Sequence, residues 1–273
     1  MGLGVHVTGK PPKKGFLPIR RKAGAVLENI GQAVDDAVTD PLLRRLMSIE
    51  RSENGLHVRL HPGEEDVLFT AVKGRIEVQA KTSSAGPGYH VMLVELLEEV
   101  GGRTGVAWSW EGRGDGEGDT TGYHEHRDFG KLRQAMLEWL ATVADQLLRA
   151  DAEGADNFRI CLPVGGGPVG PYFALAPMGE LTREWCRGAA DGNAGSLERA
   201  GAEFFTAWHG PDQAGFWVNC GRYLMRWDIA WTRPEDEGER RLYEATLGCF
   251  ARARDLDSQI GRASCRERVL FAV

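Results

Sequence analysis

The chain has 273 residues, of which 42% are hydrophobic and 26% charged, and its formal net charge is −6 at pH 7. This composition argues against disorder, and the acidic balance argues against a general nucleic-acid-binding protein. No apolar run approaches the roughly 20 residues that cross a bilayer, and the N-terminus has no signal-peptide core. Five cysteines are scattered without a CxxC pair. We therefore expect a soluble cytoplasmic protein with reduced thiols, and neither nucleic acid nor membrane as a partner.

The first part of the chain divides into a basic segment and a helix. Lysines and arginines collect in residues 1–22, with no acidic residue among them, and we expect a basic, flexible arm. Val26, Ile30 and Val34 then follow at four-residue spacing, which is typical of one face of a helix. Pro41 breaks that helix or starts a second one.

An alternating pattern replaces the helical one from Leu56 onward. The run LHVRLH is followed by DVLFTAV and RIEVQAK, and only Lys73-Gly74 separates the last two. Two such runs with so short a connection predict a β-hairpin. A loop rich in small residues then leads to a helix from about Tyr89 to Val100, which we expect to end at Gly101-Gly102.

The remaining elements alternate strands with helices. GVAWSWEG (residues 105–112) has the pattern of a strand, and a glycine- and acid-rich loop separates it from a long helix, Asp128 to about Ala150. FRICLPV and PYFALA predict two short strands around the turn GGGPVG. The chain then becomes helical and contains five of the eight tryptophans. Pro234 is suited to the first turn of the last helix.

This order of elements predicts an α+β fold. We expect a mainly antiparallel sheet with covering helices, followed by a Trp-rich, mostly helical C-terminal half. An α+β domain is assigned to residues 23–150, and DAEGADN then marks a boundary. Residues 151–259 are assigned to an α+β to mainly helical C-terminal region.

The end of the chain has a different character. Residues 260–269, IGRASCRERV, resemble one reading frame of a common short-read sequencing adapter over ten consecutive residues. We expect residues 260–273 to be a non-native tail and the natural C-terminus to be truncated. The tail is therefore left out of the interpretation of fold and function.

The Gly-rich turn before the third predicted helix is the first candidate site. A strand, a loop of small residues and a helix start can present backbone N–H groups to an anion, although neither a Walker nor a Rossmann pattern is present. The alternative is a tight turn whose hydroxyls cap the helix. The candidate ligand-binding residues are Lys81, Thr82, Ser83, Ser84, Gly86, Gly88, Tyr89 and His90, with Tyr123 from a second turn of similar sequence.

That second turn, GYHEHRD, is a candidate metal site. His124, His126 and Asp128 would share one face of a strand, and two imidazoles with a carboxylate suit zinc or non-haem iron. On a helix the same spacing scatters them, and Asp128 is also placed to cap the helix that begins at Phe129. We do not favour metal, and we expect no cofactor.

Two functional hypotheses remain. The first is a non-enzymatic binding protein of immunity-like or adaptor-like character, whose acidity favours a basic protein partner. The second is an enzyme or small-ligand protein whose pocket forms between the turns at Gly86–His90 and Gly122–Asp128. In that case His90 and His124 are the candidate catalytic residues. The sequence indicates no oligomeric state.

Overall fold

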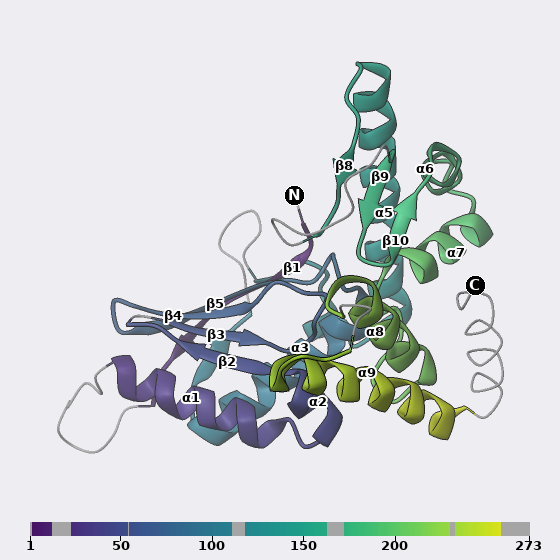
Figure 1. Cartoon of the computed structure of the whole chain (residues 1–273). Coiled ribbons are helices and arrows are strands. Elements are labelled where there is room, and N and C mark those ends of the chain that lie inside the picture. Colours follow the sequence, from purple (N-terminus) through teal and green to yellow (C-terminus); the bar gives the residue numbers. More distant parts are fainter. Residues whose placement is uncertain are drawn as a thin grey trace. The chain divides into compact units, whose positions relative to one another are not determined.

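The computed structural model describes residues 2–12, 23–53, 55–110, 118–162, 172–229 and 233–257. They form two compact units (Figure 1). Unit 1 contains the chain up to Ser83 together with His90–Leu132, and unit 2 contains Ser84–Tyr89 together with the residues from Arg133 onward. The predicted α+β class is confirmed. The division falls inside a helix after Leu132, whereas the sequence placed a boundary near residue 150.

Unit 1 contains an antiparallel sheet with helices. Its strands are β1 (Gly4–Lys10), β2 (Ser48–Arg51), β3 (Gly55–Arg59), β4 (Val67–Val72), β5 (Arg75–Lys81), β6 (Ala107–Ser109) and β7 (Gly118–Asp119), and its helices include α1 (Ala23–Ala37), α2 (Pro41–Leu46), α3 (Pro87–Thr104, from His90 on) and α4 (Tyr123–His126). The strand order is β2-β3-β4-β5-β1-β6, and β7 pairs with β1. The predicted hairpin is confirmed as β4–β5, with positive φ at both Lys73 and Gly74.

The first strand corrects the expectation of a flexible arm. Residues 4–10 form β1, which pairs with β5 on one side and β6 on the other. Val5 and Val7 are buried, and Val7 lies opposite Val78. The sequence GVHVTGK does alternate, but the lysines and arginines that follow it dominated our interpretation. The rest of the predicted arm, residues 13–22, lies outside the described residues.

The two faces of this sheet differ in chemistry. One face carries the buried apolar side chains of the strands, such as Val7, Phe69 and Leu56. Helix α1 packs there, because a Cβ on Gly31 would meet Leu56 at 3.5 Å. Helix α3 lies on the same side, because Trp108 of β6 donates its indole N–H to the carbonyl of Leu97 at 2.6 Å. The opposite face, called the open face below, carries partly exposed polar residues and includes the cross-strand row His6, Gln79, Leu68, His57.

Helix α3 does not end where the glycines predicted. It begins at Pro87, continues through Gly101 and Gly102, and ends at Thr104. The stop is Gly105, whose φ of 70° is left-handed, as is common directly after a helix. Gly101 has a packing role instead, since a Cβ there would lie 2.8 Å from the indole nitrogen of Trp108.

Unit 2 is mostly helical. It contains most of α5 (Phe129–Ala152), then β8 (Phe158–Arg159), β9 (Ala174–Ala176), β10 (Gly179–Leu181), α6 (Arg183–Ala190), α7 (Ala194–Phe204), α8 (Ala214–Trp227) and α9 (Glu237–Leu256). Strand β8 pairs with β9 in parallel, and β10 adds to β9 antiparallel. The predicted GGGPVG turn lies outside the described residues. The helical, Trp-rich second half is confirmed.

Two further expectations about unit 2 need correction. Strand β10 follows Pro177, where the sequence analysis expected only helices. Pro234 lies before the last helix, because Asp236 is its N-cap and accepts a hydrogen bond from the Glu239 N–H at 2.8 Å. Within the described part of the chain, no helix is long and apolar enough to span a bilayer.

Candidate functional site

His90 is the centre of a buried polar network in unit 1. Its side chain is 0% exposed, and its Nδ1 lies 2.8 Å from the Thr82 hydroxyl. Its Nε2 lies 3.1 Å from both Asp119 Oδ1 and the Thr121 hydroxyl. Both ring nitrogens of His90 therefore have polar partners, the Thr82 hydroxyl at Nδ1 and the Asp119 carboxylate with the Thr121 hydroxyl at Nε2. Hydroxyl, imidazole and carboxylate therefore lie in one hydrogen-bonded line.

The carboxylate of Asp119 is held in its charged form. Burial alone would raise its pKa, but the hydrogen bond and charge of His90 and the backbone N–H of His124 outweigh that effect and hold the pKa well below its usual range. The Thr121 hydroxyl also donates to Asp119, at 2.7 Å. Since the side chain is only 3% exposed, this ion is stabilised by fixed dipoles in place of water.

The network is built where several short elements meet. Thr120 accepts from the Gly4 N–H at 2.9 Å and donates to the Gly4 carbonyl at 3.0 Å, which fixes the loop of Asp119 to the start of β1. The N–H groups of Thr82 and Ser83 both donate to the Leu3 carbonyl, at 2.9 and 3.1 Å. The segment 2–4 therefore joins the end of β5 to the loop that carries Asp119 and Thr121.

The residues predicted as one ligand-binding turn are divided between the two units. Lys81, Thr82, Ser83, His90 and Tyr123 belong to unit 1. In that unit the two candidate turns do meet, because the rings of His90 and Tyr123 pack edge to face with centroids 6.1 Å apart. Among these side chains the Ser83 hydroxyl is buried and has no hydrogen-bond partner within the described part of the chain.

The other part of that turn, Ser84–Tyr89, belongs to unit 2. The Gly88 N–H donates to the Ala207 carbonyl at 2.8 Å, and the Ala207 N–H donates to the Ala85 carbonyl at 2.7 Å. A Cβ on Gly88 would lie 1.8 Å from the His209 carbonyl oxygen, and Gly86 has a φ of 109°. These glycines therefore permit close packing, and the Gly88 N–H has an acceptor within the chain. A ligand-binding role for them stays a prediction.

The second turn forms the short helix α4, which separates the three candidate metal ligands. His126 places Nε2 3.3 Å from the Thr121 carbonyl and accepts at Nδ1 from the Asp128 N–H at 2.9 Å. Asp128 caps α5, as predicted, by accepting from the N–H groups of Gly130 and Lys131 at 2.9 and 3.1 Å. Among the described residues, no group of three or more His, Cys, Asp or Glu side chains could hold a metal ion.

His124 belongs to a second cluster, closer to the surface of unit 1. Its ring stacks on Trp110 with centroids 4.0 Å apart, and its Nε2 lies 3.3 Å from Glu98. Arg127 pairs with the same carboxylate and donates to the His124 carbonyl at 2.9 Å. The His124 backbone N–H donates to Asp119 at 2.7 Å, whereas its ring packs on Trp110, so the rings of the two candidate catalytic histidines have different partners.

A groove of about 510 Å³ opens on the open face, next to the buried network. It lies among Gly2–His6, Glu65, Asp66, Leu68, Gln79–Lys81 and Thr120. Lys81 forms an ion pair with Glu65 at 3.2 Å, and Asp66 pairs with Arg59 at 3.0 Å. A Cβ on Gly2 would lie 2.9 Å from the Ser83 hydroxyl, so this unpaired group lies directly behind the first residues of the groove.

The sequence analysis named His90 and Thr82 as candidates but not Asp119 or Thr121, which also contact His90. Asp119 and Thr121 precede the second turn in a segment that we interpreted as a solvated acidic loop. A signal was present in the run Asp119-Thr120-Thr121-Gly122. An aspartate at the start of such a turn favours hydrogen bonds from nearby backbone N–H groups to its carboxylate. Asp119 does accept from the Thr121 N–H, at 2.9 Å.

Comparison with known proteins adds no assignment. No protein-family model matches this chain, and no similar curated protein or solved structure was found.

Proposed function

We propose that this chain is a non-enzymatic binding protein whose partner, a second protein, docks on the open face of unit 1. The observation that supports this proposal best is the polar groove on that face. Charged and hydrogen-bonding side chains lie around it beside apolar ones such as Leu3 and Leu68, whereas the imidazole of His90, which could perform chemistry, is fully buried behind it. A surface of this kind recognises a partner through complementary polar contacts.

The charge of the chain favours a basic partner. Glu65 is 66% exposed at the edge of the groove, and the whole chain carries −6. At the groove itself Glu65 pairs with Lys81, and Asp66 pairs with Arg59. The preference for a basic partner therefore rests on the net charge of the chain. A net negative charge accelerates association with a basic protein and orients the encounter, more than it adds affinity. An immunity-like or adaptor-like role, in which an acidic protein covers a basic one, has these properties.

Site-specific photocrosslinking in the native host tests this proposal. The photoreactive residue p-benzoylphenylalanine would replace Gln79 on the open face or, as a control, Gln134 on the exposed side of α5. We expect a discrete protein adduct at Gln79 only. The adduct should weaken in Glu65→Lys and at high salt, and it should persist in the matched control Glu153→Lys. No adduct at Gln79, or the same adduct at both positions, would rule the proposal out.

The enzyme or small-ligand hypothesis remains as a second candidate. It is favoured by the line from Thr82 through His90 to Asp119 and by the unpaired Ser83 hydroxyl behind the groove. Native mass spectrometry of the full chain, purified without chelator, tests it. A bound small molecule that is lost in Ser83→Ala would support this candidate. A wild-type mass without added ligand would argue against a tightly bound one.

A further inference from the structure

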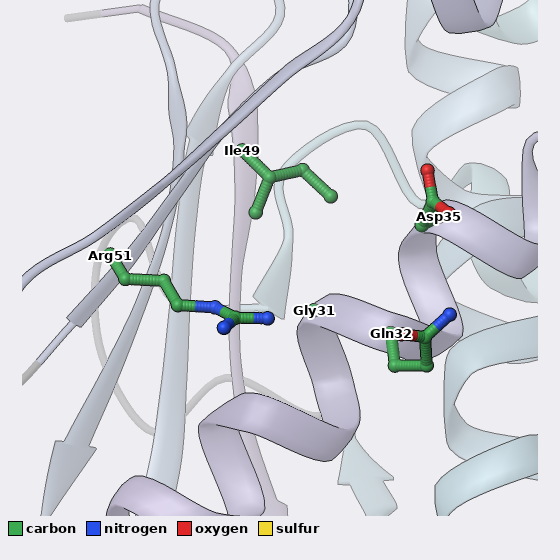
Figure 2. Close-up of a pocket in the computed structure, with 5 residues that line it drawn as sticks. All are labelled: Gly31, Gln32, Asp35, Ile49 and Arg51. Carbon is green, nitrogen blue, oxygen red and sulfur yellow. The ribbon is translucent and has the colours of Figure 1, made fainter.

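Strand β2 is an edge strand of the unit 1 sheet with a groove beside it. It pairs with β3 and stands at the end of the strand order among the residues that the structure describes. The groove has a volume of about 500 Å³ and lies between β2 and α1, lined by Gly31, Gln32, Asp35, Ile49 and Arg51 (Figure 2). It is separate from the groove on the open face, since Ile49 and Arg51 lie opposite Val58 and Leu56 of the helix-covered face.

The free edge of β2 exposes backbone groups of two residues. The Ser52 N–H donates to the Gly55 carbonyl at 2.9 Å, so these residues form a hydrogen-bonded antiparallel pair. Because such pairs alternate along a ladder, Glu50 bonds to His57, while the N–H and C=O groups of Ile49 and Arg51 point away from β3. Within the described residues these outward groups bond to no other segment. The groove therefore has two donors and two acceptors along one wall.

The groove is lined by one charged side chain of each sign, Arg51 and Asp35, and Asp35 lies 3.9 Å from Arg44. Arg51 is 58% exposed and extends from β2 toward α1, as Figure 2 shows. Its nearest carboxylate, Glu28, is 3.9 Å away and 70% exposed, a distance and exposure at which an ion pair contributes little. Gly31 leaves the space beside Arg51 open. A single Cβ at this position would already touch the guanidinium, at 3.7 Å. An acidic group can therefore reach Arg51.

We propose that the edge of β2 binds an extended peptide segment of a partner protein, which adds to the sheet as a further strand. The segment bonds to the outward groups of Ile49 and Arg51, and one of its acidic side chains contacts Arg51 from within the groove. Addition of a strand to a free edge is a general mode of peptide recognition, in which backbone bonds give affinity and adjoining pockets give specificity. This site does not depend on the proposed use of the open face.

A second copy of the chain fits the edge less well. In a two-fold antiparallel pairing centred on Arg51, the two arginines would lie directly opposite each other. A pairing centred on Glu50 would bring two glutamates together. Like charges in directly opposed positions destabilise a strand pair. A pairing centred on Ile49 has no such conflict, but it places Arg51 opposite Met47, which lies outside β2, so fewer residues pair. A foreign strand with an acidic residue can pair along the whole edge without these conflicts.

Peptide selection against the full chain tests the proposal. A phage-displayed library of random peptides would be selected against the wild type, and the enriched peptides would be measured by fluorescence anisotropy. Ile49→Pro removes an outward N–H and no bond to β3, because proline is tolerated at a free edge. Arg51→Glu reverses the charge in the groove, and Glu153→Lys in unit 2 is the control. Thermal melting would verify that each variant is folded.

We expect enriched peptides that share an acidic residue within a run of β-branched or aromatic residues. Their dissociation constant should rise about tenfold or more in Ile49→Pro and in Arg51→Glu, and it should be unchanged in the control. Equal binding to folded Ile49→Pro, or no enriched sequence at all, would overturn the proposal. If analytical ultracentrifugation shows a concentration-dependent dimer that Ile49→Pro abolishes, the edge of β2 binds a second copy of the chain, and the peptide proposal is wrong.

Discussion

Individual buried side chains give this protein a specific dependence on pH. His61 lies in the turn between β3 and β4 with 0% exposure, and burial lowers its pKa from 6.5 to about 3. Its Nδ1 accepts a hydrogen bond from the Gly63 N–H at 3.1 Å, which requires the neutral ring. The folded state therefore excludes a proton that the unfolded chain takes up below pH 6.5.

Because the unfolded state binds the proton, stability falls as pH falls from 6.5 toward about 3. Each pH unit in that window costs about 1.4 kcal/mol, so the protein should lose about 2 kcal/mol between pH 7 and pH 5 through this residue. His61→Asn retains an acceptor for the Gly63 N–H but does not titrate. Urea unfolding at both pH values should show the extra loss in the wild type only. Parallel losses in both proteins would contradict this assignment.

The same scale shows what sequence can predict about the site. Histidine draws attention because it titrates near neutral pH, so His90 was a candidate from the start. Its burial and its contact with Asp119 depend on how two segments far apart in the chain fold together, and no local pattern contains that information. Asp128 is the opposite case. Its capping role depends only on the next three residues, and that prediction was confirmed.

At the scale of elements, two glycines of one helix should behave in opposite ways. Gly88, in the first turn of α3, has no room for a Cβ, which would overlap the His209 carbonyl oxygen. A Cβ on Gly102, near the other end of the helix, would meet nothing within 4 Å. The effect on stability of an alanine is therefore set by helix propensity at Gly102 and by tertiary packing at Gly88.

Gly88→Ala should cost more than about 3 kcal/mol or prevent folding, because backbone at the contact cannot move aside and the bond to Ala207 is also at risk. Gly102→Ala should stabilise the protein by about 0.5–1 kcal/mol, the gain from alanine in a helix. Thermal and urea unfolding of the two variants would measure the contrast. Similar effects at both positions would mean that the segment 84–89 does not pack as the structure has it.

Most elements could be predicted from sequence, and the failures have physical causes. Hydrophobic periodicity predicted α1, the β4–β5 hairpin and α5, because each has one buried face. Strand β1 was missed because the lysines and arginines after it dominate the composition of the N-terminal segment. Gly101 and Gly102 were interpreted as a helix end. Gly101 instead allows Trp108 to pack closely, and the local sequence does not show that contact.

For the whole molecule, the division into two units does not follow the order of the chain. Unit 2 includes the six residues Ser84–Tyr89, which are far in sequence from the rest of it. These residues exchange two backbone hydrogen bonds with Ala207, and a Cβ on Gly86 would lie 2.7 Å from the Phe205 side chain. Local sequence patterns do not reveal a short segment that packs with residues far away in the chain.

A fragment that begins at Arg133 should therefore fail to fold by itself. Without Ser84–Tyr89, the Ala207 N–H and C=O lose their partners, and Phe205, which stacks on Trp208 at 5.7 Å, loses part of its cover. Near-UV circular dichroism of residues 133–257 should show weak aromatic signals and no cooperative melting, whereas residues 1–257 should show both signals and a sharp transition. A fragment with a cooperative transition would show that the six-residue segment is dispensable. Buried backbone groups without partners cost about 1–3 kcal/mol each, so the two groups of Ala207 together cost about 2–6 kcal/mol, a large part of the roughly 5–15 kcal/mol that stabilises a whole domain, and the exposure of Phe205 adds to this loss.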